Sequence, residues 1–537
     1  MAMANQDLVS RTWDVIVVGT GIGGATLGYA MAKAGRSVLF VEQGRSYLHD
    51  TDVIEGNWLE SLTAERGGPT ADEKFRAGRF DGAVVDISTG QPRTMRPMLG
   101  TGTGGSSAIY GMVMERFFPA DFMPGRYFRG VSGANVPDSW PISYEDLAPH
   151  YAEAETLYGV RATPDPLHPE KGSRGVVEPP PLTRASAELV ERFRAKGLHP
   201  YRLPMACEYV PDCRECIGFI CEKRCKHDSA TACLEPALRL HGAQMLTECT
   251  VRSLESENGQ IGTVTAGWRG QKLNLRGRTV VLAAGALRTP GLLLRSGSHG
   301  VGLANGSGQV GRNLMRHFID YYILYPRAAA DNSPMKQIAL NDFYIHGGQK
   351  LGTLQSNGKL PPVAAILNGY REELRRKWAP LAAMFPLVRP LAAQRLESML
   401  LGGHVMTAFM EDPPYLANRV TLGRDGETLQ IRYRIAPADQ RRLDLFRGAI
   451  LSALRPHRVA TIFRANQNGM LGHGCGTCRF GDDPRTSVLD RNNRAHEIEN
   501  LYVVDASFLP TSSGTNPSLT VAANALRVAK HLVSISR

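Results

Sequence analysis

The first fifty residues contain the feature that most constrains the fold. An apolar, β-branched run at 14–18 has the length of a buried strand, a helical pattern covers 25–34, and a second buried strand is expected at 37–41. The turn between the first strand and the helix contains three glycines in G-x-G-x-x-G spacing, which are Gly19, Gly21 and Gly24. Such a turn lets the backbone approach a pyrophosphate at the helix start, and Glu42 is placed to accept ribose hydroxyls. The sequence therefore predicts a dinucleotide-binding α/β unit.

Three later segments combine small-residue turns with apolar elements. Residues 99–117 form a loop rich in glycine and serine, which by itself fits a flexible linker and a phosphate-binding loop equally well. Residues 277–297 contain a buried strand, a small-residue turn and an apolar helix. Near the carboxyl end, a strand, a polar loop and an Ala-rich helix opened by Asn516-Pro517 follow one another.

Taken in order, these segments resemble the glucose-methanol-choline (GMC) family of FAD oxidoreductases over nearly the whole chain. The segments are the dinucleotide unit, the 100–111 loop, AAGALRTPGLLLRSG, and the closing VVDAS and NPSLTVAANALRVA. The resemblance implies FAD as cofactor and oxidation of an alcohol or sugar hydroxyl to a carbonyl by hydride transfer to the flavin. Oxygen, a quinone and a redox protein are all open as electron acceptors. Alternatives are a flavin-containing lyase or decarboxylase, a dehydrogenase that uses an iron–sulfur cluster, and a binding protein with a vestigial flavin site.

The resemblance also implies an α/β fold in which a Rossmann-type FAD-binding domain is assembled from separated segments. The segments expected in this domain are 1–50, 95–135, 205–312 and 466–537. The segments expected in a substrate domain with an antiparallel sheet and helices are 51–94, 136–204 and 313–465. The implied cofactor contacts are Gly19, Gly21, Gly24, Glu42, Gly102, Gly105, Ser106, Val251, Ala284, Asp505, Ala506 and Pro517. Residues 106–110 lack the histidine that attaches FAD covalently in some members, so FAD is expected to be noncovalent.

A catalytic base can be sought from the chemistry. Hydride removal from an alcohol carbon requires that a base take the hydroxyl proton, and histidine suits this task near neutral pH. His473, in GHGCGTCRFG, matches the family segment that carries the base, and Asn516 matches a second active-site position occupied by His or Asn. His317, in GRNLMRHF, also resembles a family position, but its segment leads into the substrate domain and we expect it to be structural.

Six of the nine cysteines lie between Cys207 and Cys233. Four of them, Cys213, Cys216, Cys221 and Cys225, run C-x2-C-x4-C-x3-C, which is close enough for thiolates to share a metal or a cluster. Some flavin glucose dehydrogenases of the family carry an iron–sulfur cluster on a C-x4-C-x3-C stretch, which Cys216, Cys221 and Cys225 reproduce. A disulfide or packed free thiols are the alternatives, and these are favoured, so no metal is predicted.

Composition and charge argue against several other classes of protein. The formal net charge is +11, but the basic residues are scattered, so nucleic acid is not an expected partner. No uninterrupted apolar stretch is long enough to span a membrane, and the amino terminus lacks the features of a secretory signal, so a cytoplasmic location is expected. Residues 370–385 are basic and amphipathic, with Pro380 interrupting them. They fit a solvated helix or lid, or weak contact with a membrane surface.

Overall fold

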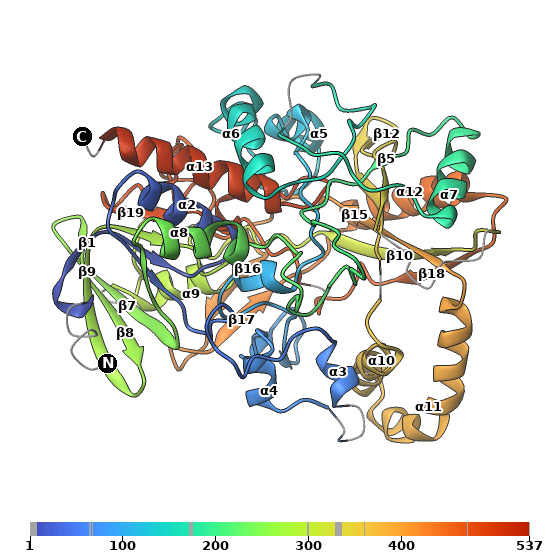
Figure 1. The fold of residues 1–537 in the computed structure, drawn as a ribbon, viewed down its shortest axis with the longest axis horizontal. Coiled ribbons are helices and arrows are strands. Elements are labelled where there is room, and N and C mark those ends of the chain that lie inside the picture. The colour runs from blue at the N-terminus through green and yellow to red at the C-terminus, as the bar shows by residue number, and fades with distance from the viewer. Residues whose placement is uncertain are drawn as a thin grey trace.

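The computed structural model describes residues 8–535 apart from 64–65, 67, 171–174, 298–299, 328–335, 359 and 470. Two large sheets organise these residues, and they lie at opposite ends of the molecule in Figure 1. The sheet built around the amino-terminal strand packs in one hydrophobic core, and the second sheet packs in another. The α/β fold class predicted from the sequence is confirmed.

The first sheet has seven strands and contains the predicted dinucleotide unit. Its order is β6 (Gln244–Leu246), β2 (Val38–Val41), β1 (Thr12–Val18), β9 (Gln271–Leu282), β8 (Gln260–Trp268) and β7 (Cys249–Glu257), and β19 (Leu501–Val503) also pairs with β9. β6, β2, β1, β9 and β19 are parallel, whereas β9, β8 and β7 form an antiparallel meander. β1 is buried along most of its length, as its continuous apolar run predicts.

Helices from both ends of the chain cover this sheet. The predicted first helix is α2 (Ile22–Lys33), and the helix predicted after Asn516-Pro517 is α13 (Ser518–Ile535). α13 packs against α2 and against α6 (Tyr144–Leu157), and the three lie together at the upper left of Figure 1. The dinucleotide unit is therefore completed by the carboxyl-terminal segment.

The second sheet is antiparallel and has six strands. Its order is β18 (Val459–Phe463), β10 (Phe318–Leu324), β15 (His404–Met410), β14 (Gly352–Ser356), β11 (Ile338–Leu340) and β5 (Tyr201–Arg202). In β14 and β15 the register pairs Thr353 with Phe409 and Gln355 with Thr407. Because side chains alternate along a strand, these four residues share one face of the sheet.

Smaller elements surround the two sheets. A four-stranded sheet has the order β16 (Arg419–Leu422), β17 (Leu429–Arg432), β3 (Val84–Asp86) and β4 (Arg93–Met95), and a hairpin joins β12 (Ile345–His346) to β13 (Gln349–Lys350). The remaining helices are α3 (Leu59–Leu62), α4 (Ala71–Arg76), α5 (Gly125–Phe128), α7 (Arg184–Arg194), α8 (Glu235–Leu240), α9 (Arg288–Arg295) and α12 (Pro437–Leu454). The division of the chain into FAD-binding and substrate domains stays a prediction.

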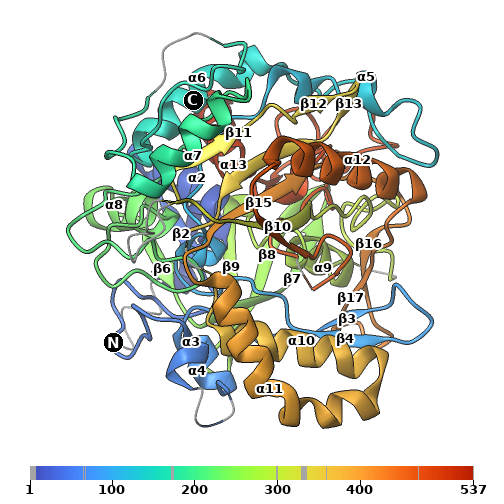
Figure 2. The ribbon, with the colours of Figure 1, turned by 90° about the vertical axis from the view of Figure 1, so that its right-hand side faces the viewer.

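Two helices project from the body as a pair. α10 (Val363–Lys377) and α11 (Ala379–Leu400) pack on each other and hang from the lower right of Figure 1, and Figure 2 shows the same pair from the side. The helix predicted over 370–385 is thus divided at Trp378, with Pro380 in the first turn of α11, where its missing N–H is not needed. Among the described helices none is long and apolar enough to cross a bilayer. The cytoplasmic location stays a prediction.

Candidate active site

The turn after β1 is tightly packed at one glycine and open at another. A Cβ atom on Gly24 would come within 2.3 Å of the Gly19 carbonyl oxygen, so only glycine lets α2 start this close to the strand. A Cβ on Gly21, in contrast, would meet no atom within 4 Å. Gly105, which has φ +50°, faces Gly21 from the glycine-rich loop. The turn is therefore open beside Gly21, at the amino end of α2, where backbone N–H groups attract phosphates.

Glu42 links the three segments that meet at this space. Its Oε1 accepts hydrogen bonds from the backbone N–H groups of Gly44 and Gly102, both at 3.0 Å. Its Oε2 accepts from Thr20 N at 3.1 Å and from Thr20 Oγ1 at 2.8 Å. A carboxylate has about four acceptor sites, so a ribose hydroxyl would have to replace one of these bonds. The direct contact between Glu42 and the ribose stays a prediction.

A cavity of about 270 Å³ adjoins the same segments. Its lining includes Gln43, Thr101 and Thr250. These three residues are the chain neighbours of three predicted cofactor contacts, Glu42, Gly102 and Val251. The cavity therefore lies next to three of the residues predicted to hold FAD, which fits a cofactor site in this part of the molecule.

The segment after β19 fixes the remaining predicted contacts. The Asp505 carboxylate accepts hydrogen bonds from Gly285 N (2.9 Å), Thr289 Oγ1 (2.5 Å) and Ser507 N (2.9 Å), which ties the turn at Ala284 to the carboxyl-terminal loop. The Ala506 carbonyl accepts from Gly476 N at 3.2 Å. The Pro517 carbonyl accepts from Val521 N in the first turn of α13. This segment therefore joins the turn at Ala284 to the loop that carries His473.

Backbone pairing brings His473 and His317 together. Met315 and Cys475 exchange two backbone hydrogen bonds of 3.0 Å as an antiparallel bridge. In antiparallel pairing, the residue two positions after Met315 lies opposite the residue two positions before Cys475. These residues are His317 and His473, and their Nδ1 atoms are 2.9 Å apart.

The hydrogen bonds of His317 determine which nitrogen of His473 is free. His317 Nε2 lies 2.9 Å from the carbonyl oxygens of Ser512 and Ser513, and because carbonyls only accept, Nε2 carries a proton. The neutral His317 ring therefore offers its Nδ1 as an acceptor, and His473 Nδ1 donates to it. This leaves the lone pair of His473 on Nε2, where it is available to accept a proton from a substrate.

The surroundings of both rings keep them neutral. Burial lowers the pKa of His317, which is fully buried. Burial also lowers the pKa of His473 well below the ordinary 6.5, and the neighbouring His317 and Lys336 lower it further. A neutral imidazole is the form that can accept a proton, so the geometry and the charge state both suit a base.

Asn516 is held on the same face of the six-stranded sheet as His473. Its Oδ1 accepts a hydrogen bond from Gln355 Nε2 at 2.6 Å, and the His473 ring stacks on Phe409 with ring centroids 5.2 Å apart. Gln355 and Phe409 lie on neighbouring strands and share one face. The bond from Gln355 fixes the plane of the Asn516 amide, whose NH2 group can only donate.

The chain matches two models of one family. The amino-terminal GMC oxidoreductase model matches residues 13–319, and the carboxyl-terminal GMC oxidoreductase model matches residues 414–525. The chain belongs to the GMC oxidoreductase family. The resemblance stated from the motifs is thereby confirmed, and the protein is an oxidoreductase.

Relatives of this GMC oxidoreductase span its whole length. Paromamine 6'-oxidase from Streptomyces fradiae is 28% identical, with 97% of this chain and 91% of the relative covered. 2-Methyl-1,2-propanediol dehydrogenase from Mycolicibacterium austroafricanum is 27% identical, with 97% and 95% covered. The structure of an FAD-dependent oxidoreductase from Chaetomium thermophilum superposes with a TM-score of 0.64 at 16% identity, covering 98% of this chain and 99% of that one. Family membership implies a flavin.

The loop where some family members attach FAD covalently is occupied by hydrogen-bonded serines in this GMC oxidoreductase. Ser106 Oγ accepts from Gly100 N at 3.0 Å, and Ser107 Oγ donates to the Gly104 carbonyl at 2.7 Å. Tyr110 donates to the His227 carbonyl at 2.6 Å. The hydroxyl groups of Ser106, Ser107 and Tyr110 therefore all help to hold the glycine-rich loop in place.

Three contacts of this site were not predicted from the sequence. His317 was expected to be structural, yet it binds the candidate base directly. Gln355 and Phe409 were not singled out, because nothing in their local sequence shows which side chains they will meet across the chain. The resemblance of GRNLMRHF to a family position was the one signal that could have identified His317.

Proposed function

We propose that this chain oxidises an alcohol or sugar hydroxyl to a carbonyl with noncovalently bound FAD, and that His473 is the general base. The observation that carries the proposal is the hydrogen-bond chain from the Ser512 and Ser513 carbonyls through His317 to His473. The two relatives carry the names of a paromamine oxidase and a diol dehydrogenase, which supports a CH-OH donor and leaves the electron acceptor open.

Each residue would have a separate task in this reaction. The flavin, when bound, supplies a hydride acceptor. His473 would take the hydroxyl proton on Nε2, and His317 would hold its ring in the required orientation and tautomer. Asn516 would donate a hydrogen bond from its NH2 group to the substrate oxygen as negative charge develops there. Gln355 would fix the direction of that amide.

Anaerobic reduction of the flavin tests the proposed reaction. A panel of sugars, aliphatic alcohols, aromatic alcohols and sterols is added to the purified protein, and we expect at least one to bleach the flavin with formation of the corresponding carbonyl compound. Product formation without net oxidation would indicate a lyase or decarboxylase. A flavin that no alcohol bleaches would contradict the proposal.

FAD is expected to be released by acid. The loop at 106–110 contains no histidine, and the serine hydroxyls there are engaged with backbone groups. Acid precipitation should therefore leave the yellow colour in the supernatant and a colourless pellet. Flavin that stays with the pellet after denaturation would show a covalent bond.

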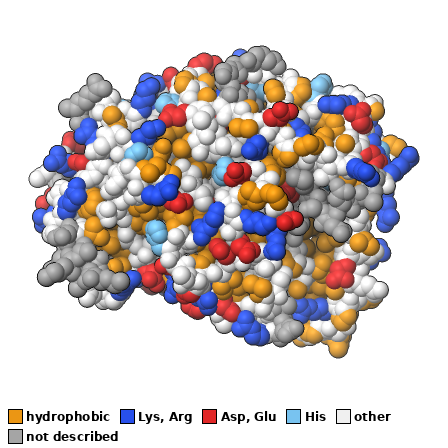
Figure 3. Space-filling view, viewed as in Figure 1, with side chains coloured by type: hydrophobic (Ala, Val, Ile, Leu, Met, Phe, Trp, Pro, Cys, Tyr) orange, Lys and Arg blue, Asp and Glu red, His pale blue; other side chains and the backbone are white. Residues whose placement is uncertain are grey.

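We also propose weak contact between α11 and an anionic membrane surface. At about 100° per residue, Leu381, Met384, Leu387, Val388 and Leu391 fall within about 120° of the helix circumference. All five are exposed, Leu387 at 79% and Leu391 at 70%. Hydrophobic side chains are visible at the lower right edge of Figure 3, where α11 lies in Figure 1. Arg389 and Arg395 are exposed on the same helix, so an anionic lipid surface complements the stripe.

Vesicle flotation measures this contact. We expect the protein to float with vesicles that contain phosphatidylglycerol, less so at high salt, and the variant Leu387→Ser/Leu391→Ser to lose most of the binding. Leu240→Ser is the matched control, because Leu240 is 62% exposed at the end of α8. Equal flotation of the double variant and the control would show that α11 does not bind the vesicles. Dimerisation through α11 would show that its apolar face binds a protein instead.

A further inference from the structure

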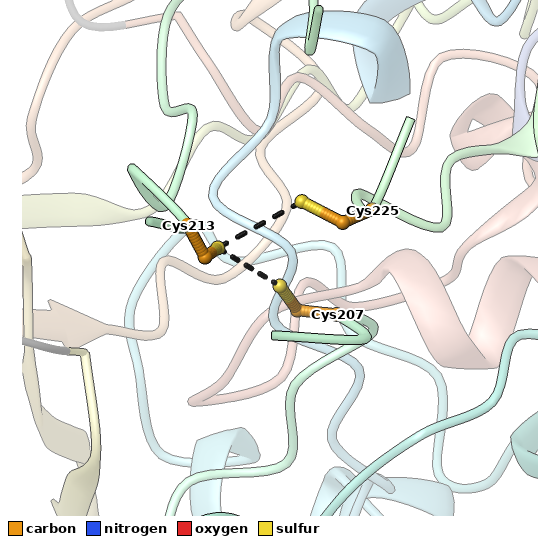
Figure 4. Close-up of side chains that lie close together, drawn as sticks. All are labelled: Cys207, Cys213 and Cys225. Carbon is orange, nitrogen blue, oxygen red and sulfur yellow. Dashed lines mark hydrogen bonds between the residues drawn. The ribbon is translucent and has the colours of Figure 1, made fainter. Parts of the chain in front are cut away.

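A cluster of thiols lies in the segment 207–225 and has no part in the proposed reaction. Cys213 Sγ lies 3.7 Å from Cys207 Sγ and 3.8 Å from Cys225 Sγ, and the three sulfurs are all within 4.8 Å of one another. Figure 4 shows Cys213 facing the other two side chains, with a dashed line to each of them. Cys221 Sγ is a further 3.6 Å from Cys225 Sγ. Three sulfur atoms thus lie close to one another, and a fourth lies beside one of them.

The backbone of the segment explains why these side chains converge. Cys207 and Lys226 form an antiparallel bridge, and Glu208 N donates to the Cys225 carbonyl at 2.9 Å, so both ends of the segment lie side by side. Between them the chain reverses at residues with positive φ, among them Asp212 at +57° and Glu215 at +46°. Cys207 and Cys225 are buried, and Cys213 is partly exposed.

The distances between the sulfurs fit the edges of a single metal tetrahedron. A zinc–thiolate bond of about 2.3 Å gives sulfur–sulfur edges of about 3.8 Å in a tetrahedral site. The Cys207–Cys213 and Cys213–Cys225 distances are 3.7 and 3.8 Å, and the Cys207–Cys225 distance is below 4.8 Å. Pairs of thiols joined by hydrogen bonds reach similar distances, but such pairs do not require three sulfurs to face a common point.

The same distances disfavour two other uses of the cysteines. In a cubane-type iron–sulfur cluster each thiolate binds its own iron, which holds the thiolates further apart than the edges of one tetrahedron. The cluster pattern read from the sequence also used Cys216, whereas the mutually close trio contains Cys207 and Cys213 in place of Cys216 and Cys221. A disulfide has a bond of about 2.05 Å, so each pair would have to move together by more than an ångström.

We propose that Cys207, Cys213 and Cys225 bind one zinc-type divalent cation, with the fourth coordination position open to water. The site departs from the sequence-based expectation of no metal. Soft thiolate ligands in tetrahedral arrangement select zinc over magnesium or calcium. Lys226, which follows Cys225, is buried, and its Nζ donates to the carbonyls of Ala108 and Phe219 at 2.8 Å.

The position of the site gives the cation a structural task. Gly218 N donates to the Ile109 carbonyl at 2.8 Å, and Lys226 Nζ donates to the Ala108 carbonyl at 2.8 Å. Both acceptors belong to the glycine-rich loop that faces Gly21. The cation would therefore hold the segment 207–226 in the shape that supports this loop, without touching substrate.

Metal analysis of the full-length protein tests the proposal independently of the redox reaction. Protein expressed in zinc-supplemented medium and dialysed against metal-free buffer should contain about one zinc ion per chain, with no acid-labile sulfide. The variants Cys213→Ser and Cys225→Ser should each lose most of that zinc. Cys233→Ser and Cys249→Ser are the matched controls, because both thiols are buried outside the cluster, and they should keep it.

A second measurement covers variants that fail to fold. Replacing zinc by cobalt in the wild-type protein should give the ligand-field bands of a tetrahedral thiolate site at wavelengths longer than the flavin absorption, and titrating the thiols with a mercurial should release zinc to a chromogenic chelator. Zinc at background level with freely titrating thiols would overturn the proposal. So would iron with sulfide, or a mass that shows a disulfide between the four cysteines.

Discussion

His473→Ala is expected to lower the rate constant for flavin reduction by an alcohol about 10²- to 10⁴-fold, while the FAD content stays normal. His473 Nε2 is the one nitrogen of the pair whose lone pair is free, and alanine provides no acceptor for the hydroxyl proton. Anaerobic stopped-flow absorbance measures the rate, and the flavin absorbance of the purified variant measures the FAD content.

The pH dependence provides an independent check on this role. Because burial holds the pKa of His473 well below 6.5, the ring is neutral above that pH and the wild-type rate should be flat there, falling only when acid protonates the ring. Asn516→Ala should lower the rate of flavin reduction less than His473→Ala does, because Asn516 donates a hydrogen bond but accepts no proton. An unchanged rate in His473→Ala across the pH series would place the base elsewhere. A larger loss in Asn516→Ala would mean that orientation limits the step.

Lys350→Met should destabilise the protein by about 3–5 kcal/mol, the usual cost of breaking a buried ion pair. Lys350 Nζ forms ion pairs with Asp121 and Glu411, and all three side chains are fully buried. Methionine has a similar length but no charge, so two buried carboxylates would be left without their cation. Urea unfolding followed by fluorescence and by circular dichroism measures the loss.

Arg129→Met is the control for this change. Arg129 pairs with Asp138 at the surface, where both side chains are more than three-quarters exposed, and such pairs contribute about 0–1 kcal/mol. If Lys350→Met is no less stable than Arg129→Met, the two carboxyls must be protonated in the folded protein. Glu411 also accepts a hydrogen bond from Ser513 N, so the loop that binds His317 should loosen in Lys350→Met.

Local sequence patterns predicted the parts of this molecule that neighbouring residues determine. The strand–turn–helix unit around Gly19, Gly21 and Gly24 could be predicted because its hydrogen bonds and its spacing lie within one short segment. The same is true of the helix after Asn516-Pro517. His473 was singled out through the family segment that surrounds it, and its role as the base stays a prediction. Each of these predictions needed only neighbouring residues.

The rest depends on contacts between distant segments. His317 meets His473 through a bridge between Met315 and Cys475 and adopts a positive φ of 60°, neither of which follows from its own sequence. Gln355 and Phe409 are adjacent because of the register of β14 and β15. Cys207 joins Cys213 and Cys225 because the chain reverses between them, although the spacing of the cysteines pointed to Cys216. Contacts of this kind between distant segments cannot be predicted from local sequence motifs.

The arrangement of the first sheet also bears on how the protein is made in the cell. The carboxyl half of β9 pairs with β1 on one side and with β19 on the other, and α2 is covered by α13. During translation β1, α2 and β9 leave the ribosome long before β19 and α13 do. Until then the edge at Val280–Leu282 and the outer surface of α2 are apolar and unpaired, which invites aggregation. Nascent chains are therefore expected to depend on chaperones until the final helix has docked.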